Sequence, residues 1–324
     1  MPPTDGAGRR AVVTGGAGFL GRAFTQRLVA AGWDVPGVDV RPGPRVITGD
    51  VTRPGPWADV LGDADLVVHT AALLGDIGDA RSHWDVNVGG TRTVAELAAA
   101  AGVGRLLHLS SIVVLGDDFP DGADETHPVR MTHNPYTDTK VAAEHVALSI
   151  AAKGLPLTIV RPGDVYGPHS AQWTVRAVTL IRKGLFVLVD GGTGIMSPVF
   201  VDDLVDGALA AGTAEAGRGE IFHVTGGVGV PAADFFGRYA EMLGRSLRSV
   251  PRYAARSLTA GAERVMRPLG VAPPFTARAL EYVTHPGTYS IAKARDVLGW
   301  EPSVSLDEGM ARTRAWLQDV GLLD

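Results

Sequence analysis

A glycine-rich turn between an apolar run and an amphipathic segment constrains this chain most. Residues 11–14 are apolar and stop at glycine, and residues 18–31 then carry apolar side chains at helical spacing. Gly15 permits a tight turn, Gly18 lets the backbone approach a pyrophosphate, and Gly21 lets the helix pack close to the strand. Because the start of such a helix offers unpaired N–H groups and a partial positive charge, the pattern predicts a bound dinucleotide.

The alternation of apolar runs and helical segments continues to residue 160. The predicted strands are 35–40, 46–48, 66–70, 105–109 and 157–160, and the further predicted helices are 84–101 and 136–153. Alternation with short connections predicts an α/β protein with a doubly wound parallel sheet, in which ligands bind beyond the carboxyl ends of the strands.

After Arg161, loops rich in glycine and proline break this alternation. We therefore expect two domains. The first is a cofactor domain at 1–165, to which 199–224 return. The second is a smaller, mostly helical substrate domain built from 166–198 and 225–324.

Composition excludes several other classes of protein. The 324 residues contain no cysteine, and the nine histidines never have a zinc-binding spacing, so we expect no metal. The net charge is −5 and the sequence has no stripe of basic residues, which argues against binding of nucleic acid. No apolar run is long enough to span a membrane, and the first ten residues lack a secretory signal, so we expect a cytoplasmic protein. His69, His108 and His223 end apolar strands and are expected to pack in the core.

Asp39 ends the second predicted strand, 18 residues after Gly21. A carboxylate there can accept hydrogen bonds from the adenosine ribose and would repel a 2′-phosphate, which favours NAD. Arg41 leaves NADP open as the alternative. Asp50 and Val51 are expected either to reach the adenine or, for Asp50, to cap a helix.

Tyr136 and Lys140 lie one helical turn apart and therefore share a face. A nearby ammonium is expected to lower the pKa of the phenol from its usual value of about 10, which would let tyrosine exchange a proton with an alcohol. Tyr-x-x-x-Lys alone is common on solvated helices. Here Ser110 and Ser111 close the strand predicted at 105–109, and Ser111 lies 25 residues before Tyr136. A hydroxyl there can hold the substrate oxygen beside the phenol.

In this order, the glycine turn, Asp39, Leu109-Ser110-Ser111, Pro135-Tyr136-x-x-x-Lys140 and residues 161–168 resemble the extended short-chain dehydrogenase/reductase superfamily, which includes NAD-dependent epimerases and dehydratases. The resemblance implies a Rossmann-type domain, a catalytic triad of Ser111, Tyr136 and Lys140, and a homodimer. With the glycine turn, the residues expected beside the cofactor are Gly15, Gly18, Phe19, Leu20, Gly21, Asp39, Arg41, Asp50, Val51, Thr70, Ala71, Ala72, Asn87, Leu109, Ser110, Tyr136, Lys140, Pro162, Gly163 and Val165.

Two positions indicate to which branch of this superfamily the chain is most similar. Members that bind nucleotide-diphosphate sugars have an asparagine where this chain has Asp164, and an arginine where it has Met196. Without the guanidinium, the site lacks a cation that would bind a diphosphate, and a carboxylate in place of the amide would repel it. The chain therefore resembles more closely the 3β-hydroxysteroid dehydrogenase-like and ketoreductase branch. The residues expected to contact the substrate are Leu73, Ser111, Asp164 and Met196.

The second half of the chain supplies apolar side chains for a pocket, of which about a third are expected to line it. They are Trp173, Leu185, Phe186, Met196, Phe235, Phe236, Met266 and Phe275. We therefore expect an NAD(P)-dependent oxidoreductase that interconverts a secondary alcohol and a ketone on a hydrophobic small molecule. The alternatives are a nucleotide-sugar epimerase or dehydratase with tightly bound NAD, and a dinucleotide-sensing regulator without turnover.

Overall fold

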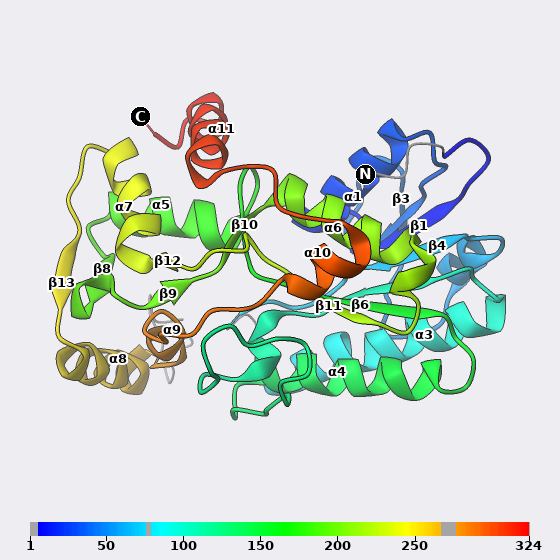
Figure 1. Cartoon of the computed structure of the whole chain (residues 1–324), viewed down its shortest axis with the longest axis horizontal. Coiled ribbons are helices and arrows are strands. Elements are labelled where there is room, and N and C mark those ends of the chain that lie inside the picture. Colours follow the sequence, from blue (N-terminus) through cyan, green and yellow to red (C-terminus); the bar gives the residue numbers. More distant parts are fainter. Residues whose placement is uncertain (1–5, 76–78, 267–276, 324) are drawn as a thin grey trace.

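The centre of the computed structural model, which describes residues 6–75, 79–266 and 277–323, is a seven-stranded sheet in the order β11-β6-β5-β4-β1-β2-β3 (Figure 1). All neighbouring strands are parallel. The strands are β1 (Ala11–Thr14), β2 (Gly37–Asp39), β3 (Val46–Thr48), β4 (Leu66–His69), β5 (Leu106–Leu109), β6 (Leu157–Pro162) and β11 (Ile221–Val224). The strand order reverses between β1 and β4, so a ligand crevice is expected at their carboxyl ends. The predicted doubly wound sheet is confirmed as a Rossmann-type fold.

Helices cover both faces of the sheet (Figure 1). On one face α1 (Phe19–Ala30) packs against α6 (Val201–Thr213), and on the other α3 (Gly90–Ala101) packs against α4 (Pro135–Ala151). Strand β1 shows why the apolar runs are continuous, because Val12 belongs to one buried core and Val13 to the other. Side chains that alternate between two covered faces must all be apolar.

The helix predicted at 84–101 begins earlier than expected. It starts with α2 (Ala80–His83) and continues through a π-helical turn, Trp84–Gly89, into α3. The physical reason is the cap: the Asp79 carboxylate accepts a hydrogen bond from the Ser82 backbone N–H at 2.7 Å. The other predicted elements agree with the structure to within two or three residues.

The C-terminal half adds further helices and short strand pairs, most of which lie in the left half of Figure 1, whereas α10 lies nearer the centre beside α6. The helices are α5 (Arg176–Arg182), α7 (Ala232–Met242), α8 (Arg252–Met266), α9 (Ala277–Tyr282), α10 (Ala292–Leu298) and α11 (Leu306–Asp319). The strand pairs are β7 (Asp164–Tyr166) with β10 (Pro198–Phe200), β8 (Val187–Val189) with β13 (Arg248–Val250), and β9 (Ile195–Met196) with β12 (Val230–Pro231). Phe275, one of the eight candidate pocket residues, lies outside the described residues.

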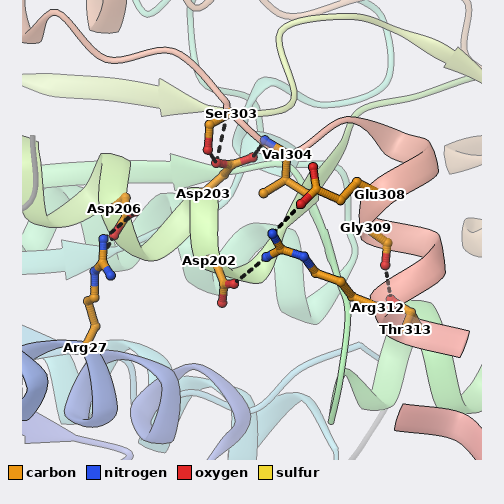
Figure 2. Close-up of polar contacts among 10 residues, drawn as sticks. All are labelled: Arg27, Asp202, Asp203, Asp206, Ser303, Val304, Glu308, Gly309, Arg312 and Thr313. Atoms are coloured by element: carbon orange, nitrogen blue, oxygen red, sulfur yellow. Dashed lines mark hydrogen bonds and ion pairs between the residues drawn. The ribbon is translucent and has the colours of Figure 1, made fainter. Parts of the chain in front are cut away.

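Helix α6 ties the C-terminal segment to the sheet layer (Figure 2). The buried Asp203 carboxylate accepts hydrogen bonds from the backbone N–H groups of Ser303 and Val304, both at 2.9 Å, and from the Ser303 hydroxyl at 2.8 Å. Asp206, one turn later, pairs with Arg27 of α1 at 2.7 Å. These contacts hold residues 303–304 against α6 and join α6 to α1.

Candidate active site

A single cavity of about 1080 Å³ extends from the glycine turn, past the carboxyl ends of the strands, to the helices of the C-terminal half. Every residue predicted beside the cofactor lines this cavity except Asn87. The predicted substrate residues Leu73, Ser111 and Asp164 also line it. The fold thus brings residues between positions 15 and 165 to one wall.

The glycine turn fits a dinucleotide because a side chain would block it. Gly15 has a φ of 73°, and a Cβ on Gly21 would lie 2.0 Å from the Gly15 carbonyl oxygen. Helix α1 begins after Gly18 without a side-chain cap and without an acidic residue in its first turn. Its first N–H groups are therefore available to an anionic group in the cavity.

Asp39 links the glycine turn to the end of β2. Only 7% of the residue is exposed, and its two oxygens accept hydrogen bonds from the backbone N–H groups of Ala17 at 3.1 Å and Arg41 at 2.9 Å. The Arg41 guanidinium lies 3.4 Å from the same carboxylate. Asp50 both lines the cavity and accepts hydrogen bonds from the Thr52 backbone and hydroxyl, which lower the pKa of Asp50.

Ser110 adds an unsatisfied polar group to the same wall. Its hydroxyl oxygen is buried and has no hydrogen-bond partner within the described part of the chain. Because buried polar atoms are nearly always paired, this hydroxyl is suited to a ligand.

Tyr136 stands in the first turn of α4, where Asn134 caps the helix. The Asn134 side-chain oxygen accepts hydrogen bonds from the backbone N–H groups of Tyr136 at 3.0 Å and Thr137 at 3.1 Å, and Pro135 occupies the first helical position. The Tyr136 phenol makes a polar contact with the Ser111 side chain. The two residues predicted to hold and protonate the substrate oxygen therefore meet at the cavity wall.

Lys140 is buried one turn further along α4. Its ammonium donates a hydrogen bond to the Leu109 carbonyl at 2.8 Å, and burial lowers the pKa of Lys140 to about 8. Glu144, on the next turn, opposes that shift. Glu144 itself forms a buried bidentate ion pair with Arg161 of β6, at 2.8 and 2.9 Å.

The predicted effect of Lys140 on Tyr136 is wrong for the protein alone. Burial raises the pKa of Tyr136 to about 12, and only the Ser111 contact acts against it. The reason is that removing the phenolate from water outweighs a lysine whose ammonium is directed at a backbone carbonyl. Tyr136 is therefore protonated at neutral pH.

Two predicted site residues do not line the cavity. Asn87 donates to the Leu73 carbonyl at 3.1 Å and to the Thr139 hydroxyl at 3.0 Å, and accepts from the Leu73 N–H at 2.8 Å. It holds Leu73 in place at the cavity wall. Met196 is fully buried in the apolar core, so it is not placed to contact a substrate there.

The apolar end of the cavity is built by the second half of the chain. Of the eight candidates, of which about a third were expected to line the pocket, Trp173, Leu185, Phe186 and Phe236 line the cavity. Phe235 belongs to the core, and Met266 is not among the lining residues. Sequence reasoning missed Tyr282, which lines the cavity from α9. It also missed Asn134, although an asparagine before proline at a helix start could have been recognised as a cap.

The three histidines on strands of the sheet, His69, His108 and His223, are buried as predicted. His69 hydrogen-bonds the Thr14 hydroxyl at 2.6 Å and stacks on His108, with ring centroids 5.5 Å apart. Burial lowers the pKa of His69 and of His223 to about 3. Within residues 6–75, 79–266 and 277–323, no cluster of His, Asp and Glu could hold a metal ion, and no helix is long and apolar enough to cross a membrane.

The model of the NAD dependent epimerase/dehydratase family matches residues 11–225. The chain belongs to this family. The family is NAD-dependent, which confirms the expected cofactor at the level of the family. The match covers the sheet, the glycine turn and the Tyr136–Lys140 pair.

Relatives over the whole length are oxidoreductases by name. The 2-alkyl-3-oxoalkanoate reductase of Stenotrophomonas maltophilia (strain K279a) is 30% identical over 326 residues, which cover 94% of this chain and 98% of that protein. A 3-beta-hydroxysteroid dehydrogenase of Mycolicibacterium neoaurum is 27% identical, over 96% of this chain and 92% of that protein. These names confirm an enzyme of the oxidoreductase class and the resemblance to ketoreductases and hydroxysteroid dehydrogenases.

Among solved structures, MoeE5 in complex with UDP-glucose and NAD superimposes with a TM-score of 0.79. It is 26% identical and the match covers 96% of this chain and 99% of that one. The likeness extends beyond the sheet to the C-terminal helices.

Proposed function

We propose that this protein is an NAD-dependent oxidoreductase that interconverts a secondary alcohol and a ketone on a hydrophobic small molecule. The observation that carries the proposal is the contact of Tyr136 with Ser111 in a cavity that has the glycine turn at one end and apolar side chains at the other. The names of the reductase and dehydrogenase relatives support it.

The glycine turn, Asp39 and Ser110 are the residues that would hold the dinucleotide. When bound, its nicotinamide would supply or accept the hydride. Lys140 keeps two N–H donors after its bond to Leu109, and these can hold the cofactor ribose.

The chain's own groups favour proton donation. At neutral pH Tyr136 carries its proton, because burial raises its pKa to about 12. Ser111 can donate a hydrogen bond to a ketone oxygen, and Tyr136 can transfer its proton to that oxygen as the alcohol forms. At neutral pH Tyr136 is therefore in the protonation state that reduction of a ketone requires.

We also propose the two-domain division at 1–165 with 199–224, against 166–198 with 225–324, and a homodimer as in the superfamily that the chain resembles. Sedimentation equilibrium would give twice the mass of 33.8 kDa if the dimer forms. A single-chain mass at micromolar concentration would refute it.

A nucleotide-sugar epimerase is the second candidate, favoured by the similarity to MoeE5. Asp164 opposes it, because a buried carboxylate in the cavity wall repels a diphosphate. Binding of UDP-glucose to the NAD-loaded protein at micromolar concentration would support this candidate against the ketone reductase.

The deciding experiment is the substitution Tyr136→Phe, with NADH oxidation followed at 340 nm over a panel of ring ketones. We expect a loss of kcat by a factor of about 10² to 10⁴ with unchanged NAD affinity by calorimetry. Tyr253→Phe is the matched control, since Tyr253 is 76% exposed on α8 and lies outside the cavity wall. Full activity in Tyr136→Phe would refute the assignment.

A further inference from the structure

A carboxylate without a cation lies in the wall of the substrate cavity. Asp164, the first residue of β7, is 1% exposed and lines the cavity. One oxygen accepts a hydrogen bond from the Ser197 backbone N–H at 2.8 Å, and the other accepts one from the Tyr282 hydroxyl at 2.6 Å. No lysine or arginine in the described segments forms an ion pair with it. Such a group is costly to bury, so its retention calls for an explanation.

Tyr282 packs against two aromatic rings in the same cavity as Tyr136. Its ring packs against Trp173 and His285, with centroids 5.7 and 5.5 Å apart. Tyr282 and Trp173 line the same cavity as Tyr136. The Tyr136 phenol also contributes to raising the pKa of Tyr282, so the two phenols lie within electrostatic range of each other.

The direction of the hydrogen bond fixes what the pair can offer a ligand. A tyrosine hydroxyl has one proton, and Tyr282 donates it to Asp164. The Tyr282 oxygen is then left with lone pairs only. Burial raises the pKa of Asp164 to about 6, so above that pH Asp164 is ionised and is likewise an acceptor. The pair therefore presents acceptors without donors in a largely apolar wall.

We propose that Asp164 and Tyr282 form a substrate subsite that accepts a hydroxyl group of an uncharged ketone and rejects a carboxylate in the same place. A substrate hydroxyl would donate a hydrogen bond to Asp164 or Tyr282, whereas a second substrate carbonyl has no proton to donate. A substrate carboxylate would be repelled by the negative charge of Asp164 in a region of low dielectric. The subsite rests on the proposed function, because that function makes this end of the cavity the substrate end.

The test measures binding, so that it does not depend on turnover. Matched trios of ketones, each unsubstituted, hydroxylated or carboxylated, are prepared on cyclohexanone, decalone and androstanone skeletons. Their Kd values for the protein saturated with NAD are measured by calorimetry at pH 8. In at least one trio we expect the hydroxy ketone to bind about tenfold more tightly than the unsubstituted ketone, and the carboxylate to bind most weakly.

Variants assign the preference to the pair. Tyr282→Phe keeps the ring and removes the hydroxyl, so the hydroxyl preference should fall to about twofold or less. Asp164→Asn removes the negative charge and should reduce the difference in Kd between the carboxylated and the unsubstituted ketones. Tyr253→Phe, on the exposed face of α8, should retain both preferences.

The subsite is overturned if no trio shows a hydroxyl preference, or if Tyr282→Phe keeps it. NADH oxidation with the same ketones separates this result from the fate of the proposed function. Turnover without a hydroxyl preference removes the subsite alone. A hydroxyl preference that Tyr282→Phe abolishes, without turnover of any ketone, supports the subsite and removes the reductase assignment.

Discussion

The substitution Glu144→Gln tests how the buried ion pair supports Lys140, the lysine of the proposed catalytic triad. Glu144 and Arg161 have side chains that are each 3% exposed, and two hydrogen bonds join them. Neutralising one partner leaves the other charge buried without compensation, which costs about 3–5 kcal/mol. An unfolding entropy of about 2.1 cal/mol/K per residue for 324 residues converts this cost to a fall in Tm of about 4–7 °C.

Thermal unfolding followed by circular dichroism measures the effect. Glu308→Gln is the matched control, because Glu308 pairs with Arg312 on the exposed face of α11 (Figure 2) and should change stability by less than about 1 kcal/mol. The double variant Glu144→Gln/Arg161→Met removes both charges and should recover most of the loss.

The same substitution should alter the pH profile of activity. Glu144 is the group that raises the pKa of Lys140 against burial, which by itself lowers it. Without the carboxylate, Lys140 loses its proton at a pH below about 8, and the alkaline fall of kcat/KM moves to lower pH. If Glu144→Gln is as stable as the Glu308→Gln control, and kcat/KM falls at the same alkaline pH as in the unchanged protein, the ion pair neither stabilises the fold nor raises the pKa of Lys140.

Three further predictions concern the cofactor site and the core. Gly21→Ala places a Cβ 2.0 Å from the Gly15 carbonyl oxygen and should weaken NAD binding at least tenfold, as measured by calorimetry. Gly237→Ala is the control, because the space around its Cβ is open and NAD affinity should not change. Equal NAD affinities of the two variants would refute the steric argument. Asp39→Ser removes the carboxylate that opposes a 2′-phosphate and should lower the Kd ratio of NADP to NAD; an unchanged ratio contradicts this role. His223 binds its proton only below about pH 3 when folded but near 6.5 when unfolded, so its contribution to stability is complete above pH 6.5 and is lost as the pH falls towards 3. His223→Gln should therefore reduce the slope of stability between pH 6 and 4 in urea titrations by about 1.4 kcal/mol per pH unit, and an unchanged slope would disprove the assignment.

Local physics made the cofactor half of the protein predictable from its sequence. Gly15 and Gly21 are required by steric contacts within one turn, and the alternation of apolar segments follows from a sheet covered on both faces. Tyr136 and Lys140 share a helix face because of helical periodicity alone. These relations extend over only a few residues, so the order of residues along the chain is sufficient to state them.

Only the tertiary structure decided the features that depend on burial and on distant partners. Asp164 and Tyr282 are 118 positions apart and meet through α9, and Met196 turned out to be core although it lies beside a loop. The sign of the Tyr136 pKa shift also changed, because desolvation sums over every atom packed around the phenol. Those atoms come from segments far apart in the sequence, and no spacing or periodicity along the chain records which of them become neighbours.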